Sequence, residues 1–228
     1  PEYVERRQVG DQSWLVVAAD PGTVWPQLEA FVRSRQLPVQ ESSANQGVIV
    51  TPQATLRLQS ALRAGSSEVR CDQSGQSAES CLTALEQYLG ARSATASSSS
   101  WTAQRLASEQ TLQLRQQGDE WEVLIPQPTD RVWAELNHYL SLDFTQEGQR
   151  NLLATSADDY EFLVEYMTET ERGRNPLQIV FGPDVKQIRL ALEPNGDQTV
   201  LRAINASERS FSADDQRELL ERVSGYLR

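Results

Sequence analysis

An internal repeat is the feature that most constrains what this chain can fold into. The segment Asp20-Pro-Gly-Thr-Val-Trp-Pro-Gln-Leu28 has a counterpart in Gln127-Pro-Thr-Asp-Arg-Val-Trp-Ala-Glu-Leu136. Apolar residues in both follow the spacing i, i+1, i+4, i+7, i+8, which is one stripe of an amphipathic helix. The two stripes are Val24, Trp25, Leu28, Phe31 and Val32, and Val132, Trp133, Leu136, Tyr139 and Leu140. A repeat of this kind predicts two copies of one structural unit.

The flanks of the two helices repeat as well. Gly10-Asp11 and Gly118-Asp119 precede them, each between strand-like segments, and predict a hairpin whose glycine takes a positive φ in a type II′ turn. A second stripe closes each unit: Cys81, Leu82, Leu85, Tyr88 and Leu89 in the first, and Leu219, Leu220, Val223, Tyr226 and Leu227 in the second. Ser77 and Ser212 are the expected N-caps of these closing helices.

Between the helices the pattern is that of β-strands. The first unit shows strand-like segments at 48–51, 56–62 and 68–72, and the longer second unit at 160–166, 177–181 and 188–192. Each unit therefore reads hairpin, helix, antiparallel strands, closing helix, which predicts an α+β fold with a long helix across one face of the sheet. We expect a first domain at 1–92, a serine-rich flexible or weakly helical linker at 93–109 and a second domain at 110–228. The expected core includes Trp25, Leu28, Trp133 and Leu136.

The charge balance restricts the partners. The chain carries a net charge of -11, and Lys186 is its only lysine. Duplex nucleic acid is bound through basic faces that displace counterions, so we expect no nucleic-acid partner. No apolar run approaches the length of a membrane-spanning helix. The numbering is expected to start inside a longer precursor, so that any leader or lipid-attachment cysteine would lie upstream of Pro1.

The sequence resembles the BamC (NlpB) lipoproteins of the outer-membrane β-barrel assembly machinery. The likeness is carried by Thr-Val-Trp-Pro-Gln at 23–27, by Gly-Val-Ile-Val-Thr at 47–51 and by the second Val132-Trp133 pair. It implies two helix-grip domains in an outer-membrane, lipid-anchored, periplasm-facing protein that binds other subunits of the complex, including a BamD-like lipoprotein. The family's lipidated cysteine and its long N-terminal arm, which docks on BamD, have no counterpart in these residues.

No residue pattern predicts catalysis, a cofactor or a metal site. The one histidine, His138, lies off the helix stripe and is expected to face solvent. The acidic groups at 158–161, 169–171 and 214–215 lack the spacing of a calcium loop and are interpreted as solvated faces and a helix N-terminus. No nucleophile elbow or phosphate-binding glycine loop is present in the sequence.

The tryptophans admit more than one interpretation. Trp25 and Trp133 lie on core stripes and are interpreted as core rather than as a ligand cage, and Trp14 and Trp121 follow the hairpin turns. Trp101 lies in the polar linker. We expect it to dock the linker on a domain, and the alternative is an exposed anchor for a partner.

The two cysteines are expected to lie near each other. Cys71 shares one strand face with Val69, and Cys81 begins the stripe of the following helix. A disulfide between them would close a short loop and add about 2–3 kcal/mol if unstrained, and the compartment implied by the family resemblance is oxidising. The alternative is two buried thiols that pack as small apolar groups.

Three functions remain after these considerations. The first is a non-catalytic accessory protein of the barrel-assembly complex, with a partner-binding surface that the sequence does not identify. The second is a carrier that holds an apolar small molecule in a cavity between helix and sheet. The third, weaker hypothesis is an enzyme that uses such a cavity. A core filled by Trp25 and Trp133 favours the first, and a deep apolar cavity under them favours the second.

Overall fold

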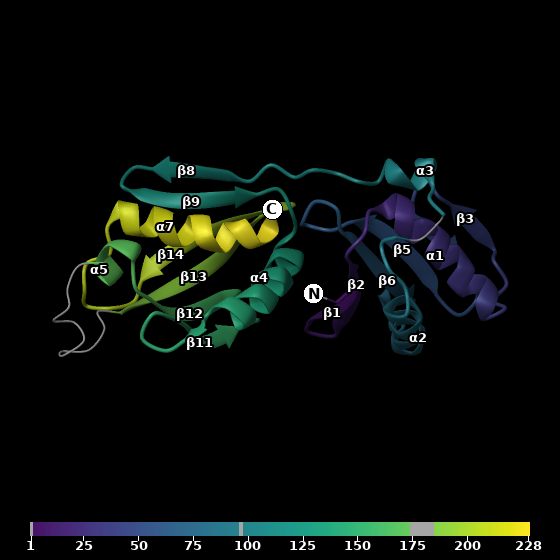
Figure 1. Cartoon of the computed structure of the whole chain (residues 1–228), viewed down its shortest axis with the longest axis horizontal. Helices are drawn as coiled ribbons and strands as arrows, with labels where there is room; N and C mark the ends of the chain where they lie inside the picture. Colours follow the sequence, from purple (N-terminus) through teal and green to yellow (C-terminus); the bar gives the residue numbers. More distant parts are fainter. Residues whose placement is uncertain (1, 96–97, 174–184) are drawn as a thin grey trace. The chain divides into compact units, whose positions relative to one another are not determined.

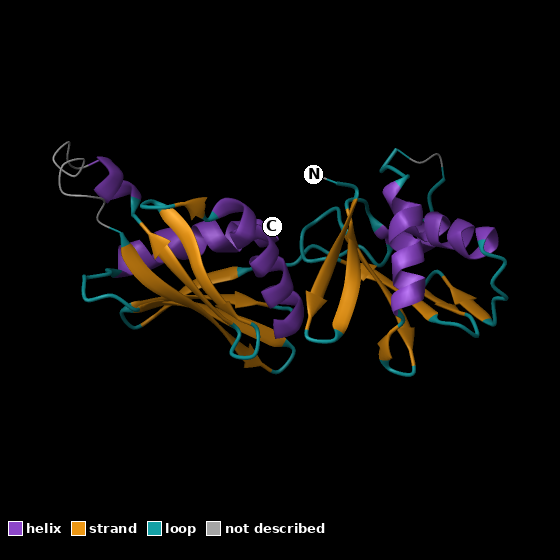
Figure 2. Ribbon diagram, turned by 90° about the horizontal axis from the view of Figure 1, so that it is seen from below, coloured by secondary structure: helices purple, strands orange, loops and turns teal. Residues whose placement is uncertain are grey.

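The computed structural model describes residues 2–95, 98–173 and 185–228. The chain divides into two compact units, residues 1–110 and 111–228. Each unit is an α+β structure in which helices pack on an antiparallel sheet (Figures 1 and 2). The chain thus has the α+β class and the two antiparallel sheets that its repeat predicts.

The first unit begins with a hairpin, β1 (Val4–Val9) and β2 (Gln12–Val17), followed by helix α1 (Pro21–Ser34). Its remaining elements are β3 (Glu41–Ser43), β4 (Val48–Val50), β5 (Thr55–Ser60), β6 (Ser67–Gln73), β7 (Gln76–Ser77), α2 (Glu79–Gly90) and α3 (Trp101–Gln104). The sheet runs in the order β1-β2-β6-β5-β4-β3, and β7 pairs with β6.

The second unit begins in the same way, with β8 (Gln113–Gln117), β9 (Glu120–Ile125) and helix α4 (Thr129–Asp143). Its remaining elements are β10 (Thr145–Gln146), β11 (Arg150–Ser156), β12 (Glu161–Tyr166), α5 (Glu169–Gly173), β13 (Lys186–Asn195), β14 (Gln198–Asn205), α7 (Ala213–Ser224) and a 3-10 turn (Gly225–Leu227). Its sheet runs in the order β8-β9-β14-β13-β12-β11-β10.

The two sheets are wound in the same order. In each, the second strand of the hairpin pairs with the last strand before the closing helix, β2 with β6 and β9 with β14. The other strands then follow as an antiparallel meander, which is one strand longer in the second unit as far as the described residues go. The strand expected at 177–181 lies outside the described residues. Strand β11 was not expected, because its sequence, Arg-Asn-Leu-Leu-Ala-Thr-Ser, does not alternate and most of its side chains are not buried.

Glycine makes both hairpin turns tight. Gly10 has φ +59° and Gly118 has φ +63°, and each begins a two-residue connection between paired strands. A residue with a Cβ is disfavoured at such φ values, whereas glycine adopts them at little cost. The two Gly-Asp pairs therefore set the register of the strands that lead into α1 and α4.

The helix stripes meet the sheet and each other. Trp25 and Leu28 of α1 and Leu82 and Leu85 of α2 are buried in one apolar cluster with alternate residues of the strands. The helices also touch through aromatic rings at matching repeat positions. Phe31 lies 5.5 Å from Tyr88 in the first unit, and Tyr139 lies 5.7 Å from Tyr226 in the second, measured between ring centroids. In the second unit the contact joins α4 to the 3-10 turn after α7, because α7 ends at Ser224 and Tyr226 lies in the turn Gly225–Leu227.

We predict that Trp25→Ala lowers the free energy of unfolding by about 3–5 kcal/mol, the range for removing a large core side chain. Trp25 is only 3% exposed, so its removal leaves a cavity that the surroundings fill only partly. Urea unfolding followed by far-ultraviolet circular dichroism measures the change. Val39→Ala, at an exposed position of the same unit, is the control, and a Trp25→Ala midpoint equal to that of the control would contradict the prediction.

The second half of the segment expected to be a linker, residues 98–109, is folded onto the first unit. Residues 93–109 fall inside the first unit, and α3 packs against α1. The backbone N–H of Gly22 donates to Oε1 of Gln104 at 3.1 Å, and the N–H of Ser100 donates to the carbonyl oxygen of Gly22 at 2.7 Å. The first turn of a helix has N–H groups without partners in the helix. Because the N-cap of α1 makes no side-chain bond, Gln104 supplies an acceptor from a distant part of the chain.

The prediction that the side chain of Trp101 docks the linker on a domain is wrong. Its side chain is 87% exposed, whereas Ala103 of the same short helix is fully buried and Leu106 packs on the core. A four-residue helix cannot turn all of its side chains towards α1. The small residue takes the crowded position against α1, and the tryptophan faces solvent.

We predict that Gly22→Ala loosens the segment 98–106 from α1. A Cβ at this position would lie 2.9 Å from the carbonyl oxygen of Ser100 and 2.4 Å from Oε1 of Gln104. A local opening made easier by about 1 kcal/mol should raise the rate of tryptic cleavage after Arg105 about fivefold, because cleavage follows the population of the open state. Gly90→Ala is the control, since its Cβ would have only one neighbour, at 3.8 Å. Equal cleavage rates in the two variants would refute the prediction.

A carboxylate joins the helices of the second unit. Asp143, the last residue of α4, accepts hydrogen bonds from Nε and Nη2 of Arg222 at 2.8 and 2.9 Å. The hydroxyl of Tyr226 donates to the same carboxylate, and Nε of Arg150 lies 3.3 Å from it. These donors, Arg222 foremost, lower the pKa of Asp143 to about 2. The ionised carboxylate thus holds the end of α4 against α7.

We predict that Asp143→Asn destabilises the protein by about 1 kcal/mol near neutral pH, a modest value because the carboxylate is partly exposed. The folded-state pKa lies below the unfolded one, so the stabilisation is present above about pH 4 and is lost as the pH falls towards 2. Unfolding free energies of both proteins between pH 7 and pH 2 should therefore converge. A difference in unfolding free energy between wild type and Asp143→Asn that stays constant over this range would contradict the prediction. The variant Asp197→Asn, in an exposed turn, is the control.

Candidate functional site

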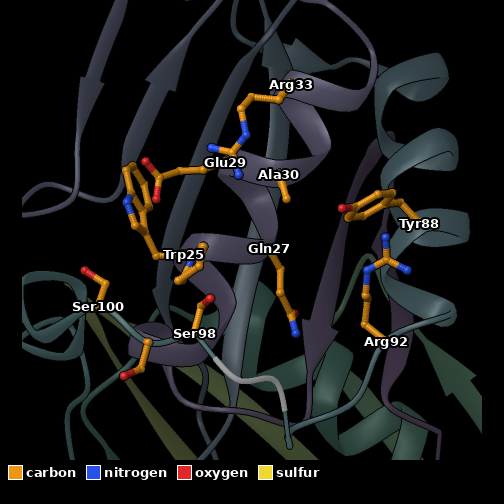
Figure 3. A pocket seen from close by; sticks show the side chains of 11 residues that line it. Trp25, Gln27, Glu29, Ala30, Arg33, Tyr88, Arg92, Ser98 and Ser100 are labelled. Carbon is orange, nitrogen blue, oxygen red and sulfur yellow. The ribbon is translucent and has the colours of Figure 1, made fainter.

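A pocket of about 580 Å³ opens on the surface of the first unit (Figure 3). It lies between the outer face of α1, the end of α2 and residues 98–100, and its volume is within the range of small-ligand pockets. The lining residues are Trp25, Pro26, Gln27, Glu29, Ala30, Arg33, Tyr88, Arg92, Ser98, Ser99 and Ser100. Trp101 follows the last of these directly in the chain.

The helical spacing of α1 creates one wall of the pocket. Pro26, Glu29, Ala30 and Arg33 follow the spacing i, i+3, i+4, i+7 and so share a face of the helix. This face lies beside the core stripe that carries Trp25, so one helix serves the sheet on one side and the pocket on the other. Glu29 and Arg33 give this wall one carboxylate and one guanidinium.

The opposite wall is fixed by aromatic and amide groups. The guanidinium of Arg92 stacks over the ring of Tyr88 at 3.9 Å, and the two lie side by side in Figure 3. Gln27 is buried between the walls: its Oε1 accepts from the hydroxyl of Tyr3 at 2.8 Å and its Nε2 donates to the carbonyl oxygen of Ser93 at 3.3 Å. With Arg33 and Arg92 against Glu29, the pocket has more cationic than anionic groups and suits carbonyl or carboxylate oxygens of a partner.

The matched tryptophans of the two long helices are buried, and the one in the second unit packs on an aromatic ring of the sheet. Trp25 is 3% and Trp133 is 5% exposed. Trp133 stacks on Phe162 of β12 with centroids 5.4 Å apart and ring planes 12° apart. A carrier of apolar molecules needs a cavity at this level, and here the side chains of α4 and the sheet occupy it.

His138 and the acidic residues at the start of α7 have structural surroundings. His138 is half-buried rather than solvent-facing as the sequence suggested, and its ring meets that of Tyr139 at 5.0 Å. Asp215 completes a capping box with Ser212 at the start of α7, as a helix N-terminus requires. Across 2–95, 98–173 and 185–228, no group of three or more His, Cys, Asp or Glu side chains is placed to hold a metal ion.

The structure brings the two cysteines together. Their Sγ atoms lie 2.9 Å apart. Cys71 is fully buried on β6, and Cys81 is partly exposed in the first turn of α2. The disulfide itself stays a prediction.

Comparison with known proteins adds no identification. No protein-family model matches the chain, and no curated protein matches it. Within the described parts of the chain, no helix is both long and apolar enough to span a membrane.

Proposed function

We propose that this chain is a non-catalytic accessory protein of outer-membrane β-barrel assembly, as its resemblance to the BamC lipoproteins implies. In this proposal both units are helix-grip domains of a lipid-anchored outer-membrane protein and face the periplasm. Its partners are protein subunits of the assembly complex, among them a BamD-like lipoprotein. It requires no cofactor. The link to this family is an analogy of motif and fold.

The exposure of Trp101 is the observation that carries the proposal. A solvated indole is uncommon on a protein surface, and tryptophan is the residue type most enriched at the energetic centres of protein interfaces. The side chain stands on a short helix that Ala103 and Gln104 hold against α1. Because this backbone is already ordered, a partner would bind without the entropic cost of folding a linker. The polar pocket begins at the adjacent Ser100.

A carrier function is the alternative, and the filled core weighs against it. Trp133 and Phe162 stack where an apolar ligand would have to lie. The pocket beside Trp101 carries arginine and glutamate side chains, which suits the polar surface of a protein better than an apolar molecule.

The test is capture of assembly-complex subunits from an outer-membrane extract of the source bacterium. The wild-type chain and the control Val39→Ala should retain the same subunits. Trp101→Ala should bind them at least about 30-fold more weakly, the effect of a hot spot worth about 2 kcal/mol. Val39 is an exposed apolar residue of the same unit, so the pair separates a specific contact from general stickiness.

Three results would overturn the proposal. The first is capture of no assembly subunit, and the second is equal capture by Trp101→Ala and wild type. The third is a small molecule retained in stoichiometric amount, detected by native mass spectrometry, which would establish the carrier function instead.

A further inference from the structure

The two cysteines of the first unit differ in their exposure to solvent. Cys71, on the central strand β6, is fully buried, and its backbone carbonyl accepts from the N–H of Ala78 at 2.7 Å just before α2 begins. Cys81 is the third residue of the 12-residue helix α2 and is partly exposed. With their sulfur atoms 2.9 Å apart, only Cys81 offers a path from solvent, and Cys71 can be reached through it.

A second pocket leads to Cys81. It measures about 130 Å³ and lies between the end of α1, the start of α2 and residues 51–56. Phe31, Leu37 and Leu56 give it apolar walls, and Arg35 is the charged residue of its lining. The volume is well below that of pockets that enclose a whole drug-sized ligand. It therefore accepts one end of a small molecule, and Arg35 favours an end that carries negative charge.

The second unit carries different residues at the corresponding helix junction. By the repeat, Leu219 matches Cys81 and Asp143 matches Arg35. Leu219 is fully buried, and Asp143 is bound by Arg222 and Tyr226. The same helix junction thus carries a buried leucine and an ion pair in one unit, and a thiol and a guanidinium beside a pocket in the other.

The surroundings of the two thiols shift their pKa values in opposite directions. The hydrogen bond between the two thiols, with the positive charge of Arg35, lowers the pKa of Cys81, and the position in the first turn of α2 acts in the same direction. The same hydrogen bond and burial raise the pKa of Cys71. Cys81 therefore ionises first, and the thiolate is the nucleophilic form.

We propose that Cys81 and Cys71 form a dithiol site that reacts with small, carboxylate-bearing disulfides, Cys81 as the attacking thiol and Cys71 as the resolving thiol. This site is independent of the surface around Trp101 and of the proposed function. Arg35 positions the negatively charged end of the disulfide.

The reaction is two thiol–disulfide exchanges. The Cys81 thiolate attacks one sulfur of the small disulfide, whose S–S bond breaks, and a mixed disulfide forms as the first small thiolate leaves. Cys71 then gives up its proton and attacks Sγ of Cys81. The bond from Cys81 to the small molecule breaks, the second small thiolate leaves with the proton, and the Cys71–Cys81 disulfide remains. The first small thiolate takes up the proton that Cys81 lost on ionising, so two protein thiols are oxidised and the small disulfide is reduced to two thiols.

Glutathione disulfide is the probe for the order of these steps, with the full chain in its reduced form and mass spectrometry as the readout. Wild type should lose the mass of two hydrogen atoms and keep no adduct. Cys71→Ser, which retains a hydrogen-bond donor, should accumulate glutathione on Cys81. Cys81→Ser should not react in the folded state and should react once denatured. An adduct on Cys71 in the folded Cys81→Ser protein, or no reaction of folded wild type, would overturn the proposal.

Alkylation of the reduced wild type tests the same assignment without any substitution. Iodoacetamide followed by peptide mapping should label Cys81 first, and label on Cys71 at an equal rate would contradict the assignment. Arg35→Gln tests the charge: in the Cys71→Ser background it should slow glutathione addition roughly two- to fivefold, the effect of one partly exposed charge. The uncharged disulfide of 2-mercaptoethanol should be unaffected, and equal slowing with both probes would remove Arg35 from the site.

Discussion

Each unit depends on the contact between two helices that share one face of a sheet. The stripes of α1 and α2 cannot both be buried unless the helices lie side by side, and Phe31 and Tyr88 meet where they do so. In the second unit Tyr139 and Tyr226 make this contact at the matching positions. An aromatic pair adds directional attraction to the burial of apolar area. The rings meet edge to face in the first unit, with planes 63° apart, and are stacked in the second, with planes 25° apart.

The two units have diverged most where this helix pair ends. In the second, Asp143, Arg222 and Tyr226 close the junction with charge-assisted hydrogen bonds. In the first, Arg35 and Cys81 border a small pocket above the buried Cys71. Neither arrangement is needed for the sheet order, which both units share. A duplicated scaffold can therefore keep its core and change the chemistry at one edge, as sites on common folds generally do.

Folding of the serine-rich segment gives the first unit its accessible features. Ser100, Ala103 and Gln104 attach α3 to the start of α1, which leaves Trp101 in solvent and makes residues 98–100 a wall of the larger pocket. The composition of this segment is that of a flexible linker. It is held in place by the hydrogen bond from the backbone N–H of Gly22 to Gln104. The N-cap of α1 makes no side-chain hydrogen bond, so a residue far along the chain supplies the acceptor.

The sequence by itself determined what depends on period and local geometry. The stripes around Trp25 and Trp133 defined the helices, Gly10 and Gly118 the turns, and the repeat the shared order of the sheets. Tertiary structure decided which face of α3 meets α1, how close the sulfurs of Cys71 and Cys81 lie, and where the pockets open. These features depend on contacts between residues distant in sequence, and side-chain periodicity carries information only about neighbours along one helix or strand.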